Sequence, residues 1–275
     1  MTEKEAIQQL EKPHTTASLI EDFRNLGVEE GMVLIVHSSL SSLGWVCGGA
    51  VAVVTALMKA VGERGTLIMP AQSADNSDPS EWENPPVPES WWQIIRDEMP
   101  AYDPGVTPSR GMGMIADVFR SFPGVSRSSH PMYSFAAWGK HADYILSEQP
   151  LEEGFGPRSP LAKIYELEGS VLLLGVTHES NTSLHFAEHS IGNREKAKKG
   201  AALMEDGSRV WKVYEEILYD SDPFEELGKE FEGIHTIKTS MIGKADCKLL
   251  DQRAVVDFAR EWLQNNNEKK GMENK

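Results

Sequence analysis

The sequence predicts an α/β fold, a single domain with a central, mostly parallel or mixed sheet flanked by helices and with a C-terminal antiparallel portion. Three short apolar runs indicate the sheet, at residues 32–37, 65–70 and 170–176. None of them alternates with polar residues, and such continuous runs are typical of strands buried on both faces. Helical patterns separate these runs, and strands interleaved with helices favour a largely parallel sheet.

Local start and stop signals indicate the helices. The first amphipathic pattern begins with threonine and ends at Gly27, because glycine readily adopts the backbone conformation that terminates a helix. Two later helices have a proline at the first helical position, Pro160 and Pro223. The predicted helices cover residues 15–26, 48–61, 223–232 and 251–263, together with one that starts at residue 160 and one that ends near residue 122. Residues 235–250 look like short antiparallel strands.

No internal repeat or linker divides the chain, so we expect residues 1–275 to form one domain. The polar residues 266–275 are expected to be a disordered tail. Residues 72–108 contain seven prolines and three tryptophans, Trp82, Trp91 and Trp92. A long loop of this kind is usually a binding loop or a lid, so we interpret it as a substrate loop. An insertion that serves packing alone is the alternative.

The composition restricts the class of partner. Lysine and arginine number 27 against 42 aspartates and glutamates, which gives a formal net charge of −15. This charge argues against nucleic acid as a partner, because phosphates require a basic surface. It favours a cationic ligand. Acidic surfaces also serve solubility alone, so the charge is a supporting observation.

We expect the protein to act in the cytoplasm and not at a membrane. The first sixteen residues lack the apolar core of a signal peptide. No run approaches the roughly 18 apolar residues of a membrane span. Cys47 and Cys247 are far apart in the sequence and form no pair of the metal-binding type, which fits a reducing compartment.

A loop of small residues follows the first predicted strand, at His37, Ser38, Ser39, Leu40 and Ser41. A helix opens shortly afterwards, and a strand, a loop and a helix start together offer backbone N–H groups to an anionic or oxyanionic ligand. Ligands of open α/β sheets bind beyond the carboxyl ends of strands, where this loop lies. The loop is neither a Walker loop, nor a dinucleotide fingerprint, nor the GxSxG turn of hydrolases. An ordinary serine-rich turn is the alternative.

A second group of polar residues follows the third predicted strand. Asn181 or Thr182 can cap a new helix, which puts His185 in its first turn. There the positive end of the helix dipole keeps the imidazole neutral, the form that accepts a proton. Glu188 is three residues further on and on the same helical face, where it can orient His185 and stabilise its protonated form.

The same segment contains the motif H-x-x-E-H, which raises the alternative of a zinc hydrolase. His185 and His189 could bind Zn²⁺ with Glu188 as the base. This interpretation requires a third protein ligand downstream, and the many acidic residues there do not single one out. A capped surface helix with incidental histidines is a further alternative.

A third group, Ser109, Arg110, Gly111 and Met112, precedes the helix that ends near residue 122. An arginine beside glycine-permitted backbone at a helix start can hold a phosphate. Taken alone, these residues are better explained by a simple turn with a surface arginine.

Six segments together resemble the aminoglycoside 3-N-acetyltransferase family, in the order and spacing of that family. They are HSSLSSLG at 37–44, GTLIMPA at 65–71, TPSRGMG at 107–113, RSSHP at 127–131, SPLAKIYELEGSVLLLGV at 159–176 and NTSLHFAEH at 181–189. The resemblance covers about residues 15–265, nearly the whole chain. Six matched segments are far more specific than any single motif.

The resemblance implies an α/β domain unlike the Gcn5 fold, with acetyl-CoA as the donor, no metal, and the 3-amino group of an aminoglycoside as the acceptor. His185 and Glu188 match the histidine and glutamate that are taken as the general base pair of the family. We expect residues 37–41 and 109–112 to contact coenzyme A, with the pantetheine along 38–41 and the phosphates near Arg110. Because the family needs no histidine at position 189, the zinc interpretation loses most of its force.

The acceptor is less defined than the donor. Its cationic amines call for acidic side chains, and Asp75 and Asp78, in the loop after the second strand, are the candidates. The same chemistry on a non-antibiotic amine is the main alternative, and a non-catalytic protein that binds coenzyme A or a drug is another. The sequence leaves the oligomeric state open, a homodimer included.

Overall fold

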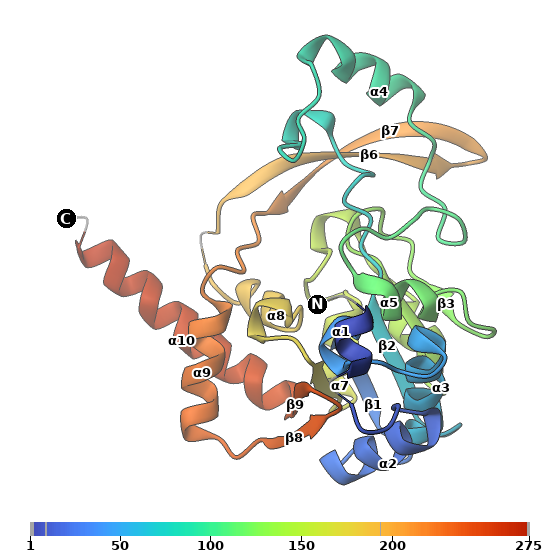
Figure 1. Ribbon diagram of the computed structural model, residues 1–275. Coiled ribbons are helices and arrows are strands. Elements are labelled where there is room, and N and C mark those ends of the chain that lie inside the picture. Colours follow the sequence, from blue (N-terminus) through green and yellow to red (C-terminus); the bar gives the residue numbers. More distant parts are fainter. Residues whose placement is uncertain (1–2, 9, 193, 274–275) are drawn as a thin grey trace.

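The computed structural model describes residues 3–8, 10–192 and 194–273, and at its centre is a mixed sheet of seven strands (Figure 1). The strand order is β3-β4-β2-β1-β5-β9-β8. β1 pairs in parallel with β2 and β5, and the remaining pairings in this sheet are antiparallel. The strands are β1 (Val33–Ser38), β2 (Thr66–Pro70), β3 (Ser126–Arg127), β4 (Phe135–Gly139), β5 (Ser170–Leu174), β8 (Lys238–Ile242) and β9 (Ala245–Asp251). The three apolar runs are therefore confirmed as strands, and they form the parallel middle of the sheet.

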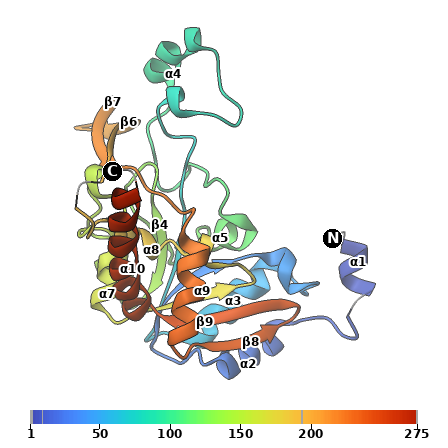
Figure 2. The ribbon, with the colours of Figure 1, turned by 90° about the vertical axis from the view of Figure 1, so that its left-hand side faces the viewer.

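Helices cover both faces of this sheet. One face packs against α2, α3 and α5, around buried residues such as Phe23 and Phe119. The other packs against α6 to α10, around Phe135 and Phe224, and Figure 2 shows α9 and α10 side by side there. The helices are α1 (Glu3–Gln8), α2 (Thr16–Leu26), α3 (Gly49–Val61), α4 (Trp92–Glu98), α5 (Gly113–Phe119), α6 (Ala142–Leu146), α7 (Pro160–Glu166), α8 (Leu184–Glu188), α9 (Phe224–Ile234) and α10 (Gln252–Glu273), with 3₁₀ turns η1 (Leu40–Leu43), η2 (Pro79–Glu81), η3 (Glu89–Trp91), η4 (Leu151–Glu153) and η5 (His178–Ser180). Within the described ranges, no helix is long and apolar enough to cross a membrane.

The start and stop signals of the sequence can be followed at both ends of α2 and at the starts of α7 and α9. Thr15 caps α2, since its hydroxyl accepts a hydrogen bond from the backbone N–H of Ser18 at 3.2 Å. Gly27 ends the same helix with a positive φ of 107°. α7 begins at Pro160 as predicted, whereas Pro223 is the residue before α9 and not its first residue.

The last helix differs from the sequence-based expectation. α10 continues to Glu273, whereas the polar composition of residues 266–275 predicts a disordered tail. This stretch contains no proline, and its glutamates, lysines and methionine favour a helix, whereas its asparagines and Gly271 favour it less. Residues 274–275 lie outside the described part of the chain.

A separate antiparallel ribbon, β6 (Lys196–Glu205) and β7 (Ser208–Ile217), is a feature that the sequence analysis missed. Its turn is Asp206–Gly207, and both residues have positive φ, 48° and 77°. An Asp-Gly pair with this backbone geometry is a strong hairpin signal, because it matches the twist of the flanking strands. The sequence therefore contains a signal for this hairpin.

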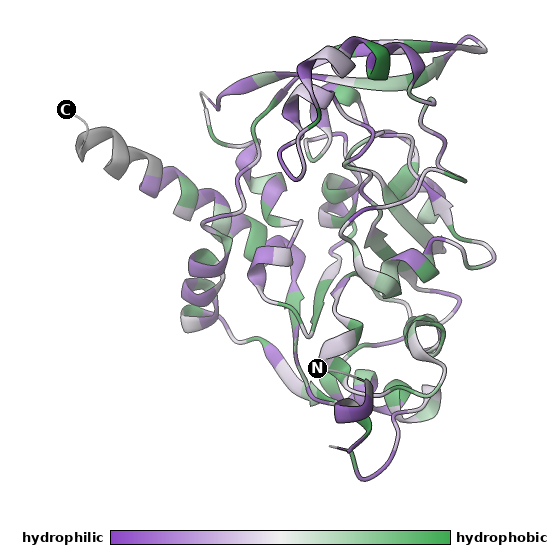
Figure 3. Ribbon diagram, turned by 45° about the horizontal axis from the view of Figure 1, so that its top comes forward, coloured by the Kyte–Doolittle hydropathy of each residue, from purple (hydrophilic) through white to green (hydrophobic). Residues whose placement is uncertain are grey.

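The proline- and tryptophan-rich residues 72–108 lie over this ribbon, as Figures 1 and 3 show for α4. Arg209 of β7 donates a hydrogen bond from Nε to the carbonyl oxygen of Met99 at 2.8 Å. The N–H of Tyr102 donates to the carbonyl oxygen of Ala202 in β6 at 2.8 Å. The segment therefore forms helix α4 and packs on the ribbon, which is the role that the packing alternative predicts; whether it also binds substrate stays a prediction.

Candidate active site

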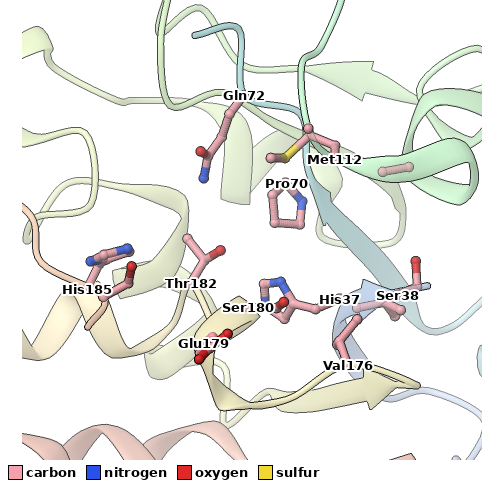
Figure 4. Close-up of a pocket in the computed structure, with 14 residues that line it drawn as sticks. His37, Ser38, Pro70, Gln72, Met112, Val176, Glu179, Ser180, Thr182 and His185 are labelled. Atoms are coloured by element: carbon pink, nitrogen blue, oxygen red, sulfur yellow. The ribbon is translucent and has the colours of Figure 1, made fainter. Parts of the chain in front are cut away.

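A pocket of about 240 Å³ opens at the carboxyl ends of β1 and β2, beside η5 and α8 (Figure 4). It is lined by Val36, His37, Ser38, Pro70, Gln72, Gly111, Met112, Ala116, Val176, Glu179, Ser180, Thr182, His185 and Ser221. The lining includes residues from all three polar groups of the sequence analysis. Because β1, β2 and β5 end at the same edge of the sheet, segments far apart in the sequence meet there.

The pair His185 and Glu188 forms as predicted on α8. His185 is the second residue of this short helix, and its Nδ1 atom lies 2.6 Å from Oε2 of Glu188. The side chain of Glu188 is 1% exposed, while His185 reaches the pocket. Asn181 does not cap the helix directly; its side-chain oxygen accepts a hydrogen bond from the N–H of Ser183, the residue before α8, at 3.2 Å.

Glu188 has further partners that hold it in place. Its Oε1 atom accepts hydrogen bonds from the guanidinium of Arg194 and from the backbone N–H of Asp220, the latter at 3.0 Å. Arg194 also donates to the carbonyl oxygen of Leu218 at 2.6 Å. These contacts fix the position of the carboxylate from the side opposite His185.

Aromatic rings fix the imidazole of His185. The ring of Phe155 is stacked on it, with centroids 4.9 Å apart and an interplanar angle of 7°. Phe224 and Tyr219 pack against it at centroid distances of 4.7 Å and 5.2 Å. Because the carboxylate of Glu188 accepts from Nδ1, the proton of neutral His185 is assigned to Nδ1. This assignment leaves the lone pair of Nε2 for a proton from a ligand.

His37 enters the same pocket from the end of β1. It is 6% exposed, and its Nε2 atom has no hydrogen-bond partner among the described residues. Burial, together with a smaller effect of His185 nearby, lowers the pKa of His37 to about 3. His37 is therefore a neutral imidazole at physiological pH.

The rest of the predicted 37–41 loop is divided between the pocket and a turn. Ser38 lines the pocket, whereas Leu40 and Ser41 begin η1. Ser39 precedes η1; its N–H donates to the carbonyl oxygen of Leu174 at 3.0 Å and its hydroxyl accepts from Ser42 at 2.8 Å. The turn is thus tied to the end of β5.

The four residues of the third group, Ser109 to Met112, do not all reach the pocket. Gly111 and Met112 line the pocket, and Gly111 has a positive φ of 75°. The Ser109 hydroxyl donates to Asp117. Arg110 forms an ion pair with Asp75, which is itself a predicted acceptor-binding residue, and both side chains are more than half exposed.

Asp78, the second predicted acceptor-binding residue, has its own partners in the 72–108 segment. Its carboxylate accepts from Arg96 Nη2 at 2.8 Å and from Arg96 Nε at 3.0 Å. It also caps η2 through the N–H of Ser80 at 3.0 Å. The structure therefore does not bring Asp78 to the pocket that His185 lines.

The residues of the H-x-x-E-H motif make different contacts. Nε2 of His189 lies 2.9 Å from the hydroxyl of Tyr219, while Nδ1 of His185 faces Glu188. Across residues 3–8, 10–192 and 194–273, no group of three or more His, Cys, Asp or Glu side chains is arranged to hold a metal ion. The two histidines of the motif therefore have different polar partners in the structure.

The sequence pattern of the family described as aminoglycoside 3-N-acetyltransferase matches residues 35–264. The chain belongs to this family. The SPbeta prophage-derived aminoglycoside N(3')-acetyltransferase-like protein YokD of Bacillus subtilis (strain 168) is 49% identical over 267 residues, which cover 97% of this chain and 98% of the relative. Aminoglycoside N(3)-acetyltransferase VII of Streptomyces paromomycinus is 33% identical and covers 96% of both chains.

Solved structures of aminoglycoside 3-N-acetyltransferases confirm the predicted fold class. The crystal structure of YokD superposes with a TM-score of 0.95 over 97% of this chain and 99% of that chain, at 49% identity. AAC-VIa bound to sisomicin superposes with a TM-score of 0.84 at 28% identity, over 93% of this chain and 99% of that chain. AAC-IIIb in a binary complex with CoASH superposes with a TM-score of 0.82 at 29% identity, over 93% of this chain and 98% of that chain.

Several residues of this acetyltransferase fold lie at the site but were missed in the sequence. Glu179 lines the pocket from η5, and Gln72 does so from the segment after β2. The rule that ligands bind beyond the carboxyl ends of parallel strands points to both positions. Phe155 contacts His185 from a segment that is distant in the sequence, and Arg194 contacts Glu188 from six residues further along the chain; no local pattern marks either of them.

Proposed function

We propose that the chain transfers the acetyl group of acetyl-CoA to an amine, with the 3-amino group of an aminoglycoside as the acceptor. The observation that carries this proposal is the contact between His185 and the buried Glu188, with His185 lining one pocket together with His37 and Ser38 at the end of β1. In this proposal residues 1–275 act as one acetyltransferase domain, and no metal takes part.

Two related structures support the choice of substrates. AAC-IIIb was solved with CoASH and AAC-VIa with sisomicin, and each shares its fold with 93% of this chain. The net charge of −15 agrees with a cationic acceptor.

His185 is the general base of the proposed mechanism. Its Nε2 atom accepts the proton of the acceptor amine while the amine nitrogen attacks the carbonyl carbon of the thioester. The C–S bond then breaks, the acetyl group stays on nitrogen as an amide, and the thiolate takes up the proton from His185. Glu188 stabilises the imidazolium that exists between these two proton transfers.

The turn after β1 is the proposed oxyanion site. The N–H of Ser39 is engaged by Leu174, but Leu40 and Ser41 begin η1. The first N–H groups of a helix have no partner inside it. We therefore assign the N–H groups of Leu40 and Ser41 to the thioester carbonyl oxygen, where they stabilise its developing negative charge.

The remaining contacts to acetyl-CoA are assigned to residues on the same side of the pocket. We place the pantetheine of acetyl-CoA against four residues that line the pocket: His37, Ser38, Gly111 and Met112. Ser109 and Arg110 come just before Gly111, and we assign them to the phosphates. A phosphate at Arg110 must compete with Asp75, the present ion-pair partner.

Glu179 is the acidic residue best placed for the acceptor. It is exposed, it lies on η5, and it lines the pocket beside Ser180 and Thr182. Asp75 and Asp78 are each paired with an arginine, so a cationic amine gains less from them. We therefore propose Glu179 as the main acceptor contact and Asp75 as a secondary one.

The decisive experiment measures thiol release from acetyl-CoA with a panel of amines: aminoglycosides, peptidoglycan amines and small amine metabolites. We expect turnover with aminoglycosides and acetylation of the 3-amino group, identified by NMR of the product. His185→Ala should lower kcat by ~10²–10⁴-fold, as expected for a positioned base, and should leave acetyl-CoA binding largely intact. Turnover confined to another class of amine would support the same chemistry on a different acceptor, and full activity of His185→Ala would refute the base assignment.

A further inference from the structure

Tyr219 lies just after the ribbon, and its hydroxyl group is the centre of a buried hydrogen-bond network behind the catalytic pair. The hydroxyl donates to Oε1 of Glu216 at 2.9 Å. It accepts from the backbone N–H of Phe155 at 3.1 Å, and Nε2 of His189 lies 2.9 Å away. Because the single hydroxyl proton goes to Glu216, His189 must donate its Nε2–H to the tyrosine oxygen.

Tyr219 and His189 each keep a single protonation state at neutral pH, and Glu216 is buried. Burial raises the pKa of Tyr219 far above its ordinary range, so the hydroxyl keeps its proton. Burial lowers the pKa of His189 to about 4, so its ring is neutral. Glu216 is 0% exposed, and the same oxygen that accepts from Tyr219 also accepts from the N–H of Gly154 at 2.7 Å.

The network ends on the backbone that carries Phe155. Gly154 and Phe155 are consecutive, and the N–H groups of both are fixed, one by Glu216 and the other by Tyr219. The ring of Phe155 is the one that stacks on His185, with a centroid distance of 4.9 Å and an interplanar angle of 7°. Tyr219 itself contacts the imidazole edge-on, at 5.2 Å. Phe155 and His185 are therefore aligned by residues at the end of β7.

We propose that Tyr219 is a positioning residue for the base: with Glu216 it holds Phe155 flat against His185 and so keeps Nδ1 aimed at Glu188 and Nε2 at the acceptor. The inference rests on the proposed function, since it assumes that His185 is the base. It also gives His189 a role that needs no metal, as a donor to the Tyr219 hydroxyl. A small misplacement of a catalytic group is costly, because proton transfer depends on near-ideal geometry.

The test compares Tyr219→Phe with Tyr133→Phe in the thiol-release assay. Tyr133 is a matched control, because its ring packs on Phe155 at 4.6 Å and on Tyr219 at 5.3 Å while its hydroxyl is outside this network. We expect Tyr219→Phe to lower kcat roughly tenfold while the KM for acetyl-CoA stays within about twofold. Tyr133→Phe should leave both constants near those of the wild type.

Two further variants separate positioning from packing. Glu216→Gln keeps an oxygen that accepts from Gly154 and Tyr219, so it should retain most of the wild-type kcat, whereas Glu216→Leu should behave like Tyr219→Phe. If Tyr219→Phe does not fold, Phe155→Leu provides the same test, because it removes the stacked ring and keeps the backbone hydrogen bonds.

The outcomes distinguish this inference from the proposed function. An active wild type whose Tyr219→Phe variant keeps full kcat, or loses no more than Tyr133→Phe, overturns the positioning role alone. A wild type that releases no thiol with any amine overturns the proposed function and this inference with it.

Discussion

Nδ1 of His185 lies 2.6 Å from a carboxylate oxygen of Glu188 that is almost completely buried. The two residues are three apart on α8, so a single turn of helix sets their contact. The opposite oxygen of Glu188 is held by Arg194 and by a backbone N–H. Both carboxylate oxygens of Glu188 are therefore held, one by His185 and the other by Arg194 and the backbone.

Replacing Glu188 by glutamine removes the charge but keeps a side chain of the same shape. We expect Glu188→Gln to lower kcat by about 100-fold, because the amide cannot stabilise the imidazolium of His185. The KM for acetyl-CoA should change little, since Glu188 does not line the pocket. Steady-state kinetics on folded protein, checked by circular dichroism, measure both constants. Wild-type kcat in this variant would contradict the role of the carboxylate.

Arg194 is expected to stabilise the fold as well as the site. Its guanidinium pairs with a carboxylate that is 1% exposed, and removing one partner of a buried ion pair leaves the other uncompensated. Arg194→Met should therefore lower the free energy of unfolding by about 3 kcal/mol. Arg64→Met is the matched control, because the Arg64–Glu30 pair is solvent-exposed and should contribute no more than about 1 kcal/mol. Urea unfolding of both variants makes the comparison, and equal losses would show that Glu188 does not depend on Arg194.

The sequence predicted those parts of the fold that local signals determine. The three parallel strands are continuous apolar runs, and the ends of α2 follow from Thr15 and Gly27. β4 was missed because Phe135–Gly139 is short and rich in alanine and glycine. The ribbon was missed although Asp206 and Gly207 signal its turn.

The same division applies to the site. The pairing of His185 with Glu188 is local and was predicted, whereas Phe155 and Tyr219 come from segments that only the tertiary fold brings to the imidazole. The ion pair of Arg110 with Asp75 is a similar case. The sequence assigned these two residues to different substrates, and nothing local shows that they neutralise each other.

Glu179 provides a test of the acceptor side. We expect Glu179→Gln to raise the KM for a cationic acceptor several-fold and to leave the KM for acetyl-CoA unchanged. The effect should weaken as ionic strength rises, because an exposed carboxylate is screened by salt. Glu63→Gln removes the same charge near the amino end of β2, on the opposite edge of the sheet, and should have no such effect. Equal KM values for the two variants would exclude Glu179 from the acceptor site.

The buried Glu216 predicts a specific dependence of stability on pH. Burial raises the pKa of Glu216 from an ordinary 4.5 to about 7, so between these values the folded protein holds a proton that the unfolded chain has released. The free energy of unfolding must therefore fall as pH rises from about 5 to about 7, and level off above it. The contribution amounts to about 3 kcal/mol at ~1.4 kcal/mol per pH unit.

Glutamine at position 216 cannot titrate, so it isolates this contribution from that of all other groups. The free energy of unfolding of Glu216→Gln minus that of the wild type should increase by about 3 kcal/mol between pH 5 and pH 8. Urea titrations at unit pH steps measure the difference, with Glu215→Gln as the control, because Glu215 is the exposed neighbour on β7. The Glu215→Gln difference should stay constant with pH. A constant difference for Glu216→Gln as well would mean that the carboxyl group of Glu216 ionises in the folded protein much as it does in the unfolded chain.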